Sequence, residues 1–398
     1  MTPKAGFTNA PKLRFKADDG SEFPEWQETM LSDICVYRNE RKEAEKCYYI
    51  STENMKQECE GIFQFEETEL ISGVAFEPGN VLVANIRPYL KKAWAATFQG
   101  VASADVLVFK ATNVIPSFLH TLIARETFFT YVMTGAKGVK MPRGDKSHIM
   151  EMPVGIPSLS EQQKIADFFT SLDDLISAQS GRVEGLKEYK KGMMQKVFSQ
   201  EVRFKADDGS DFPEWKQCEL QDICQTTRET VDPTLYPEDS FSEYSMPAYD
   251  NKKTPTCCIG KEMHSIRFVV SEPMILFNKL NVRKKRIWKV LCPAPNSVCS
   301  TEFIPILPTQ NHMGYLEIVL GSDEVTEYVK AISTGTSNSQ KRITPSDFWA
   351  MEIPVPSLPE QQKIADFFTA LDEVIDAAKE RLEALKEMKK GFMQQMFV

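Results

Sequence analysis

The chain has 398 residues, of which 42% are hydrophobic and 26% are charged. This length predicts at least two domains, because a single hydrophobic core rarely serves so long a chain. The sequence contains no apolar run long enough to span a membrane, and its first 14 residues lack the apolar core of a signal peptide. Nine scattered cysteines without a C-x-x-C pair then predict reduced thiols and a cytoplasmic protein. The net charge of −9 excludes a protein that grips DNA by bulk positive charge, although a local basic face remains compatible with it.

Internal repetition is the strongest feature of the sequence. RFKADDGSEFPEW at 14–26 returns as RFKADDGSDFPEW at 203–215, and SLSEQQKIADFFT at 158–170 returns as SLPEQQKIADFFT at 357–369. The copies lie 189 residues apart at the first segment and 199 apart at the second, so the second half has a longer middle. Each half thus has a near-constant opening, a divergent middle and a near-constant end, which predicts two copies of one architecture.

The openings are predicted to support the core of each half. Trp26 and Trp215 are expected to be core anchors. The paired acids Asp18-Asp19 and Asp207-Asp208 are expected to form turns, because they lack the alternating oxygen ligands of a calcium loop.

The divergent middles are predicted to contain strands and helices in the same order. In the first half, VLVANIRPYLKK (81–92) and SADVLVFKA (103–111) predict strands flanking a basic connection. A helical stretch at 116–133 and a Thr-Gly loop at 134–135 follow. The second half repeats this order with MILFNKLNVRKKRIWKV (274–290), STEFIPIL (300–307), a helical stretch at 313–332 and Thr334-Gly335.

Each near-constant end is predicted to form one long helix. Pro-Ser followed by Glu-Gln-Gln is typical of a helix N-terminus, and unbroken helices over 163–198 and 362–397 would each be about 50 Å long. Gly181, Gly185 and Gly192 indicate a kink or break in the first helix. Apolar residues recur at two positions per heptad, which are Ile165, Leu172, Leu186 and Met193 with Phe168, Leu175 and Tyr189 in the first helix, and Ile364, Leu371, Ala378, Leu385 and Phe392 with Phe367, Val374 and Met388 in the second. We expect the helices to pack on each other, since packing each only on its own domain would leave the later heptads exposed.

Catalytic motifs are missing from the sequence. It contains no N-P-P-Y/F or D-P-P-Y/F of base methylation, no phosphate-binding G-x-x-x-x-G-K-S/T, no G-x-G-x-x-G and no H-E-x-x-H. Its four histidines lie too far apart for helical metal spacing. We therefore expect a chain without catalytic residues, metal or cofactor.

Basic and amide side chains at matching places in both halves are predicted to contact DNA. Lys and Arg can neutralise phosphates or read guanine, and Asn or Gln can read adenine. The competing interpretation is a solvated basic strand edge that prevents aggregation, but matched clusters in both halves favour DNA. The candidates are Asn85, Arg87, Tyr89, Lys91, Lys92, Lys137, Lys140 and Arg143 in the first half, and Asn278, Lys279, Asn281, Arg283, Lys284, Lys285, Ser337, Asn338, Gln340, Lys341 and Arg342 in the second, where Arg286 and Lys289 extend an acid-free run.

The duplicated PSL-x-EQQKIADFF…LD helix, the FPEW…L-x-DI opening and the VLVANIRPYLKK…SADVLVF and TGTSNSQKRI middles resemble the specificity subunits of type I restriction–modification enzymes. The resemblance covers essentially the whole chain. It implies an α+β fold in which two globular target-recognition domains are separated by two long antiparallel helices, which form a coiled coil with pseudo-twofold symmetry. We therefore expect recognition domains at 1–157 and 200–356, and spacer helices at 158–199 and 357–398.

The same resemblance implies a non-catalytic subunit that reads two specific blocks of double-stranded DNA separated by an unspecified spacer. Its partners would be two methyltransferase subunits and, through that complex, nuclease-translocase subunits. One alternative is a coiled-coil scaffold whose domains bind proteins, which accounts for the helices but not for matched basic clusters. Another is a nuclease with an unrecognised site, which metal-dependent cleavage by the isolated chain would reveal.

Overall fold

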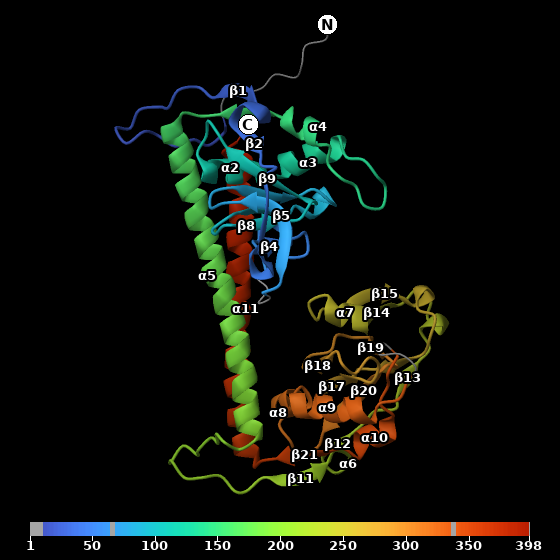
Figure 1. The fold of residues 1–398 in the computed structure, drawn as a ribbon. Helices are drawn as coiled ribbons and strands as arrows, with labels where there is room; N and C mark the ends of the chain where they lie inside the picture. The colour runs from blue at the N-terminus through green and yellow to red at the C-terminus, as the bar shows by residue number, and fades with distance from the viewer. Residues whose placement is uncertain (1–10, 64–67, 336–339, 398) are drawn as a thin grey trace. The chain divides into compact units, whose positions relative to one another are not determined.

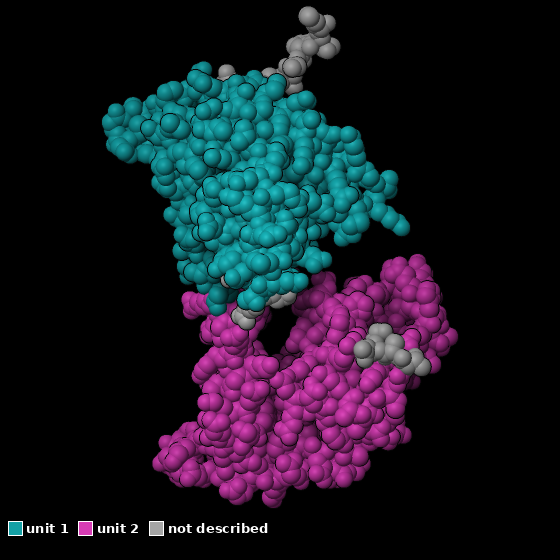
Figure 2. Space-filling view, in the orientation of Figure 1, with its two compact units in different colours: residues 1–181, 380–398 teal, residues 182–379 magenta. Residues whose placement is uncertain are grey.

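The computed structural model describes residues 11–63, 68–335 and 340–397, and its internal contacts divide the chain into two units (Figure 2). Unit 1 combines residues 1–181 with 380–398, and unit 2 comprises residues 182–379. Each unit therefore contains the divergent middle of one half together with a segment of each long helix.

Unit 1 contains two four-stranded sheets (Figure 1). The first, in spatial order, consists of β2 (Cys35–Tyr37), β9 (Val106–Ala111), β6 (Val81–Ala84) and β7 (Ala93–Ala95), all antiparallel. The second consists of β3 (Arg41–Glu45), β5 (Leu70–Phe76), β8 (Gly100–Ala102) and β4 (Tyr49–Ile50), of which β4 and β8 are parallel. Unit 1 also contains the antiparallel pair β1 (Gln27–Met30) and β10 (Pro153–Ile156), and the helices α1 (Leu31–Ile34), α2 (Pro116–Ile123), α3 (Glu126–Thr134) and α4 (Lys146–Met150).

The first sheet of unit 1 is buried on both faces, which explains its continuous apolar sequences. Val81 and Val83 of β6 enter a core with α2, α3 and the start of the first long helix, whereas Leu82 and Ala84 enter a core with the second sheet. Successive side chains of a strand point to opposite faces, so a strand covered on both sides needs apolar residues at every position. The layers are therefore helices, the first sheet and the second sheet.

Unit 2 repeats these layers with different residues. Its sheets are β12 (Cys224–Gln225), β20 (Phe303–Pro308), β17 (Met274–Asn278) and β18 (Ile287–Val290), and β13 (Thr230–Val231), β16 (Arg267–Val269), β19 (Ser297–Ser300), β14 (Ser240–Tyr244) and β15 (Thr256–Ile259). The pair β11 (Lys216–Glu219) and β21 (Glu352–Val355) matches β1 and β10. The helices are α6 (Leu220–Ile223), α7 (Met246–Asp250), α8 (Met313–Leu320), α9 (Asp323–Ile332) and α10 (Pro345–Trp349).

The two long helices are α5 (Leu159–Phe198) and α11 (Leu358–Gln395), and they pack against each other in both units (Figure 1). In unit 1, Lys389 binds Asp173 at 2.5 Å, and in unit 2, Lys190 binds Asp372 at 2.5 Å. The two ion pairs join equivalent residues of the repeat, since Asp173 and Asp372, and Lys190 and Lys389, are each 199 positions apart. The predicted kink is wrong, because α5 is helical throughout. Across the described residues, no helix is both long and apolar enough to cross a bilayer.

The heptad prediction is correct at one position and wrong at the other. Leu175 and Tyr189 of the predicted second position are 56% and 53% exposed, and Val374 and Met388 are 44% and 42% exposed. The covered residues at that position lie one residue further on. The two covered sets of α5 are Ile165, Leu172, Gln179, Leu186 and Met193, and Phe169, Ile176, Val183, Lys190 and Val197. Those of α11 are Ile364, Leu371, Ala378, Leu385 and Phe392, and Phe368, Ile375, Leu382 and Lys389, which Met396 continues just beyond the end of the helix. Gln179, Lys190 and Lys389 interrupt these sets, so the positions of the apolar residues alone did not reveal the spacing.

The near-identical sequence segments bind each other. The guanidinium of Arg14 donates to the fully buried carboxylate of Glu161 at 3.0 Å, and Arg203 donates to the fully buried Glu360 at 3.2 Å. A second ion pair joins the same two segments in each half, between Lys164 and Asp18 and between Lys363 and Asp207, each at 2.6 Å. The repeated motifs therefore join each opening to a long helix, and the acid expected at the helix N-terminus forms a buried ion pair.

The other predictions for the openings are confirmed, except that one of the two predicted core anchors is only half-buried. Asp19 and Asp208 each accept the backbone N–H of the serine two residues on, at 2.9 Å, in a turn. Trp26 is buried, whereas Trp215 is half-buried and donates its Nε1–H to Glu360 at 3.0 Å.

Candidate nucleic-acid interface

In unit 1 the basic connection and the loop after the predicted Thr-Gly pair form one surface at the end of β6. We call residues 85–92 and 279–286 the connections, and residues 134–145 and 334–344 the loops. Within unit 1, the backbone of Ile86 forms a β-bridge with Arg143, and the backbone N–H of Arg87 donates to the loop at 2.8 Å. Candidates that are far apart in the sequence are therefore neighbours in the structure.

Asp105 fixes this surface. It directly precedes β9, and its backbone carbonyl accepts the N–H of Asn85 at 2.8 Å. Its carboxylate accepts the Nε–H of Arg143 at 3.1 Å. Asn85 also donates its side-chain amide to the carbonyl of Gly144 at 3.1 Å. One acid thus binds both the connection and the loop.

Unit 2 has the same framework with other side chains. The backbone of Leu280 forms a β-bridge with Arg342, and the N–H of Asn281 donates to the carbonyl of Lys341 at 2.8 Å. Glu302 replaces Asp105: its carboxylate accepts Arg342 at 2.7 Å, and its carbonyl accepts the backbone N–H of Lys279 at 3.0 Å. These matched contacts make Arg87 and Asn281 structurally equivalent.

Two further features of the framework recur. Arg87 and Asn281 both have left-handed backbone conformations, with φ of 52° and 54°, which turn the chain sharply where each connection leaves its strand. Lys91 binds Glu126 at the start of α3 at 2.5 Å, and Lys285 likewise binds Asp323 at the start of α9 at 2.5 Å. Each connection is thus held to a helix by a lysine.

The remaining candidates divide into paired and unpaired side chains. In the described part of the chain, no hydrogen bond or ion pair engages the side chains of Arg87, Tyr89, Lys140, Lys279, Arg283 and Lys341. Paired side chains include Lys92, which donates to the carbonyl of Thr52 at 2.7 Å, Lys137, which binds Asp145 at 2.6 Å, and Lys284, which lies 3.7 Å from Asp250. Gln340 is exposed, and Ser337 and Asn338 lie outside the described residues.

Ion pairing and burial shift the pKa of several of these groups. The hydrogen bond from Lys137 and two backbone N–H groups lower the pKa of Asp145 to about 2. Burial lowers the pKa of Lys92, whereas the hydrogen bond to Glu126 raises the pKa of Lys91. Pairing thus favours the charged forms of Lys91 and Asp145, whereas burial disfavours the charged form of Lys92.

Acidic partners from other elements reduce the positive charge of the second cluster. Arg286 is buried and makes a bidentate ion pair with Asp250, with Nε–Oδ1 at 2.8 Å and a second contact at 2.6 Å. Lys289 binds Glu317 at 2.9 Å. The acid-free run in the sequence is therefore not an acid-free surface, because Asp250 and Glu317 belong to α7 and α8.

Sequence reasoning missed Asp105 and Glu302, which organise the two surfaces. A signal was present: each is an acid that directly precedes the apolar strand of its half, β9 or β20.

Unpaired buried polar atoms also gather at these surfaces. Four such atoms, within the described ranges, are Oδ1 of Asn85, Nδ2 of Asn278, Oδ1 of Asn281 and Oε2 of Glu302. A buried polar atom without a partner costs free energy, so a group of them indicates a place where a ligand or water completes the hydrogen bonding.

Comparison with known proteins identifies relatives of both halves. The family model described as the type I restriction modification DNA specificity domain matches residues 24–188 and 213–387. The type I restriction enzyme MjaVIII specificity subunit of Methanocaldococcus jannaschii is 22% identical over 418 aligned positions, which cover 95% of this chain and 94% of that protein.

Solved structures share the fold. The crystal structure of the S subunit of a type I restriction–modification system from M. genitalium matches with a TM-score of 0.60 at 14% identity, over 98% of this chain and 99% of that one. A chain from a study of complex assembly and conformational transition in a type I system matches with a TM-score of 0.58 at 15% identity, over 94% and 97% of the two chains.

Proposed function

The chain belongs to the family of type I restriction–modification DNA specificity subunits, and from that premise we propose that each of its domains reads one block of a bipartite DNA target. The observation that carries this proposal is the framework built twice. Asp105 and Glu302 bind Arg143 and Arg342 in the same way, while the exposed residues at equivalent positions differ in chemistry. One scaffold with two different surfaces is what two readers of different sequences require.

The candidate residues divide into two roles under this proposal. The side chains that position the surface are paired: Oδ1 of Asn278 accepts the backbone N–H of Leu280 at 2.7 Å, and the others are Asn85, Lys91, Lys92, Lys137, Arg143, Lys284, Lys285 and Arg342. The unpaired side chains of Arg87, Tyr89, Lys140, Lys279, Arg283 and Lys341, together with Asn281, Ser337, Asn338 and Gln340, contact DNA. Arg and Asn can read base edges by bidentate hydrogen bonds, and Lys neutralises phosphates.

The subunit directs chemistry that other chains perform. We propose that it binds double-stranded DNA together with two methyltransferase subunits, and through them nuclease-translocase subunits, in the cytoplasm. The acidic total of the chain supports a shared grip on DNA, because partners would then supply part of the positive charge.

Exchange of one recognition domain tests this proposal. Residues 203–356 would be replaced by the corresponding segment of a relative with a known target that also has an arginine at the position of Arg203, so that the ion pair with Glu360 is kept. We expect the methylated motif to change in one block and to keep the other, as mapped by single-molecule sequencing. The reciprocal exchange in the first half is the control and should change only the other block. A change in both blocks after either exchange would refute two independent readers.

A further inference from the structure

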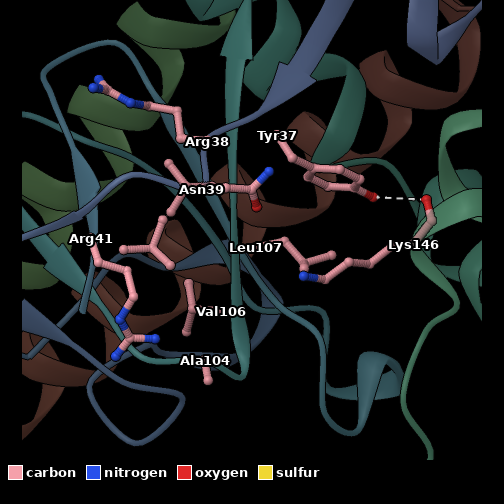
Figure 3. Close-up of a pocket in the computed structure, with 10 residues that line it drawn as sticks. Tyr37, Arg38, Asn39, Arg41, Ala104, Val106, Leu107 and Lys146 are labelled. Carbon is pink, nitrogen blue, oxygen red and sulfur yellow. Dashed lines mark hydrogen bonds between the residues drawn. The ribbon is translucent and has the colours of Figure 1, made fainter. Parts of the chain in front are cut away.

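A pocket in unit 1 lies beside the surface just described. It has a volume of about 230 Å³. Its apolar lining includes Val74, Val106 and Val108, and its polar lining is Tyr37, Arg38, Asn39, Arg41 and Lys146 (Figure 3). Ala104 and Val106, which both line it, flank Asp105. The pocket thus adjoins the acid that holds the connection and the loop together.

The charges around the pocket leave two cations uncompensated. Arg38 binds Glu77 at 2.7 Å and Glu40 at 3.3 Å, and Lys42 also binds Glu40. Arg41 is exposed and, among the described residues, its side chain has no hydrogen bond or ion pair. The ammonium of Lys146 has no acidic partner there either, and it lies 5.9 Å from the centre of the Tyr37 ring.

The backbone holds these groups in place. The hydroxyl of Tyr37 donates to the carbonyl of Lys146 at 3.2 Å, which ties the start of α4 to the end of β2. Figure 3 shows the side chains of Asn39 and Lys146 reaching over the pocket from opposite sides, with Arg41 at its edge. Two cations and an amide beside an apolar lining match the chemistry of a sugar–phosphate unit: the sugar packs on valines, and the phosphate accepts hydrogen bonds.

The second domain has lost most of this chemistry. In unit 1, Arg41 of β3 pairs with Val74 of β5, and Val74 pairs with Ala102 of β8. In unit 2, Thr230 of β13 pairs with Phe268 of β16, and Phe268 pairs with Cys299 of β19. Thr230 therefore occupies the position of Arg41. Pro345 occupies that of Lys146, because each follows the N-cap of its helix. Aligning Cys35 with Cys224 places Thr227 at the position of Arg38 and Arg228 at the position of Asn39. One cation remains where unit 1 has three.

We propose that this pocket binds a backbone phosphate of the DNA beside the block read by the first domain, through Arg41, Asn39 and Lys146. The inference rests on the proposed function and adds a site that only the first domain has. It also accounts for a difference between the two halves, because the connection and loop of the first domain carry fewer unpaired cations than those of the second. The first domain would contact phosphates through this pocket, and the second through the unpaired cations of its connection and loop.

The test uses the full chain assembled with its methyltransferase partner, and measures binding to a random-sequence duplex and to a target duplex over a range of salt concentrations. For Arg41→Thr, the residue of the second domain, we expect binding about three- to fivefold weaker. The plot of log affinity against log salt should become shallower by about one unit. Lys146→Ala should behave alike, and the double variant should lose about two units. The loss should be equal for both duplexes and the methylated motif unchanged, because phosphate contacts carry no sequence information.

Lys42→Ala is the matched control, since it removes the same charge from the adjacent position of β3 without lining the pocket. It should leave the salt slope unchanged. Wild-type slopes in both Arg41→Thr and Lys146→Ala would overturn the pocket while leaving the proposed function intact, as would a slope change in Lys42→Ala equal to theirs. Binding of free inorganic phosphate or nucleotide that Arg41→Thr abolishes, with DNA binding unaltered, would also overturn it. A wild-type complex that does not bind DNA at all would refute both proposals.

Discussion

Arg87 and Asn281 occupy the same corner of two equivalent connections, with the same left-handed backbone and the same hydrogen bond to the loop. Their neighbours two residues on, Tyr89 and Arg283, are exposed in both units. Because the framework around these positions is shared, differences in what the domains read are expected to originate at these side chains and in the loops.

Replacing Arg87 by alanine should relax base preference in one block of the target. We expect a loss of about 1–3 kcal/mol of discrimination at one base pair, measured as relative affinity for duplexes varied one position at a time. Asn281→Ala is the matched control and should affect the other block. If Arg87→Ala instead weakened all duplexes equally and reduced the salt slope, Arg87 would be a phosphate contact.

His120 makes the stability of unit 1 depend on pH. Its Nε2 atom is buried without a partner among the described residues, and burial lowers the pKa of the ring from 6.5 to about 4. Between these two values the unfolded chain binds a proton that the folded unit does not bind, so the free energy of unfolding falls as the pH drops from 6.5 to 4. The loss should be on the order of 3 kcal/mol.

Denaturant unfolding of His120→Leu above and below this pH window checks the expectation. The variant should show a smaller pH dependence than the wild type, whatever its absolute stability. His264→Gln, at an exposed histidine, is the control and should keep the wild-type dependence. An unchanged dependence in His120→Leu would show that another group titrates.

At the scale of elements, the glycines of α5 weaken a helix that is nevertheless continuous. A Cβ atom added at Gly181 or Gly185 would meet no atom within 4 Å. Alanine has the higher helix propensity, so each replacement should raise the free energy of unfolding by about 0.5–1 kcal/mol. Thermal and denaturant unfolding measure this.

Gly144→Ala is the opposite case and serves as the control. Its Cβ atom would lie 2.7 Å from Cγ1 of Val132 and 2.8 Å from Oδ1 of Asn85, so the loop would have to shift and stability should fall. If Gly185→Ala instead lowered the free energy of unfolding, another part of the folded chain would have to contact the side of α5 that carries Gly185.

Elements with strong local signals could be predicted from the sequence. The apolar runs of β6, β9, β17 and β20 and both long helices occur where the pattern placed them. The second heptad position was misplaced by one residue, because Lys190 and Lys389 occupy it and form ion pairs, and no hydrophobic count detects a covered lysine.

The candidate surface was predictable only in part. Repetition located the connections and the loops, but the sequence does not tell which acids reach them. Asp250, which belongs to α7, neutralises Arg286, and Asp323, which belongs to α9, binds Lys285. Such pairs depend on tertiary contacts between segments separated by dozens of residues, whose distances no local pattern encodes. Asp105 and Glu302 differ in this respect, since their matched positions before a strand could have been noticed.

At the scale of the whole molecule, each unit is completed by the other half of the chain. Met396 and Phe397 are buried in the core of unit 1, and Val197 is buried in that of unit 2. Phe397 packs edge-on against Trp26 and stacks on Phe118. The C-terminal ends of the two long helices are therefore part of the hydrophobic cores of the units.

Single-molecule methylation mapping tests whether this chain selects the sequence that is methylated. Cells that carry this chain with its genomic neighbours would be compared with cells in which only this chain is deleted. We expect a bipartite adenine-methylated motif that disappears on deletion and returns on complementation. An active neighbouring methyltransferase without such a motif, or with a motif that survives the deletion, would contradict a specificity role and favour a protein-binding scaffold.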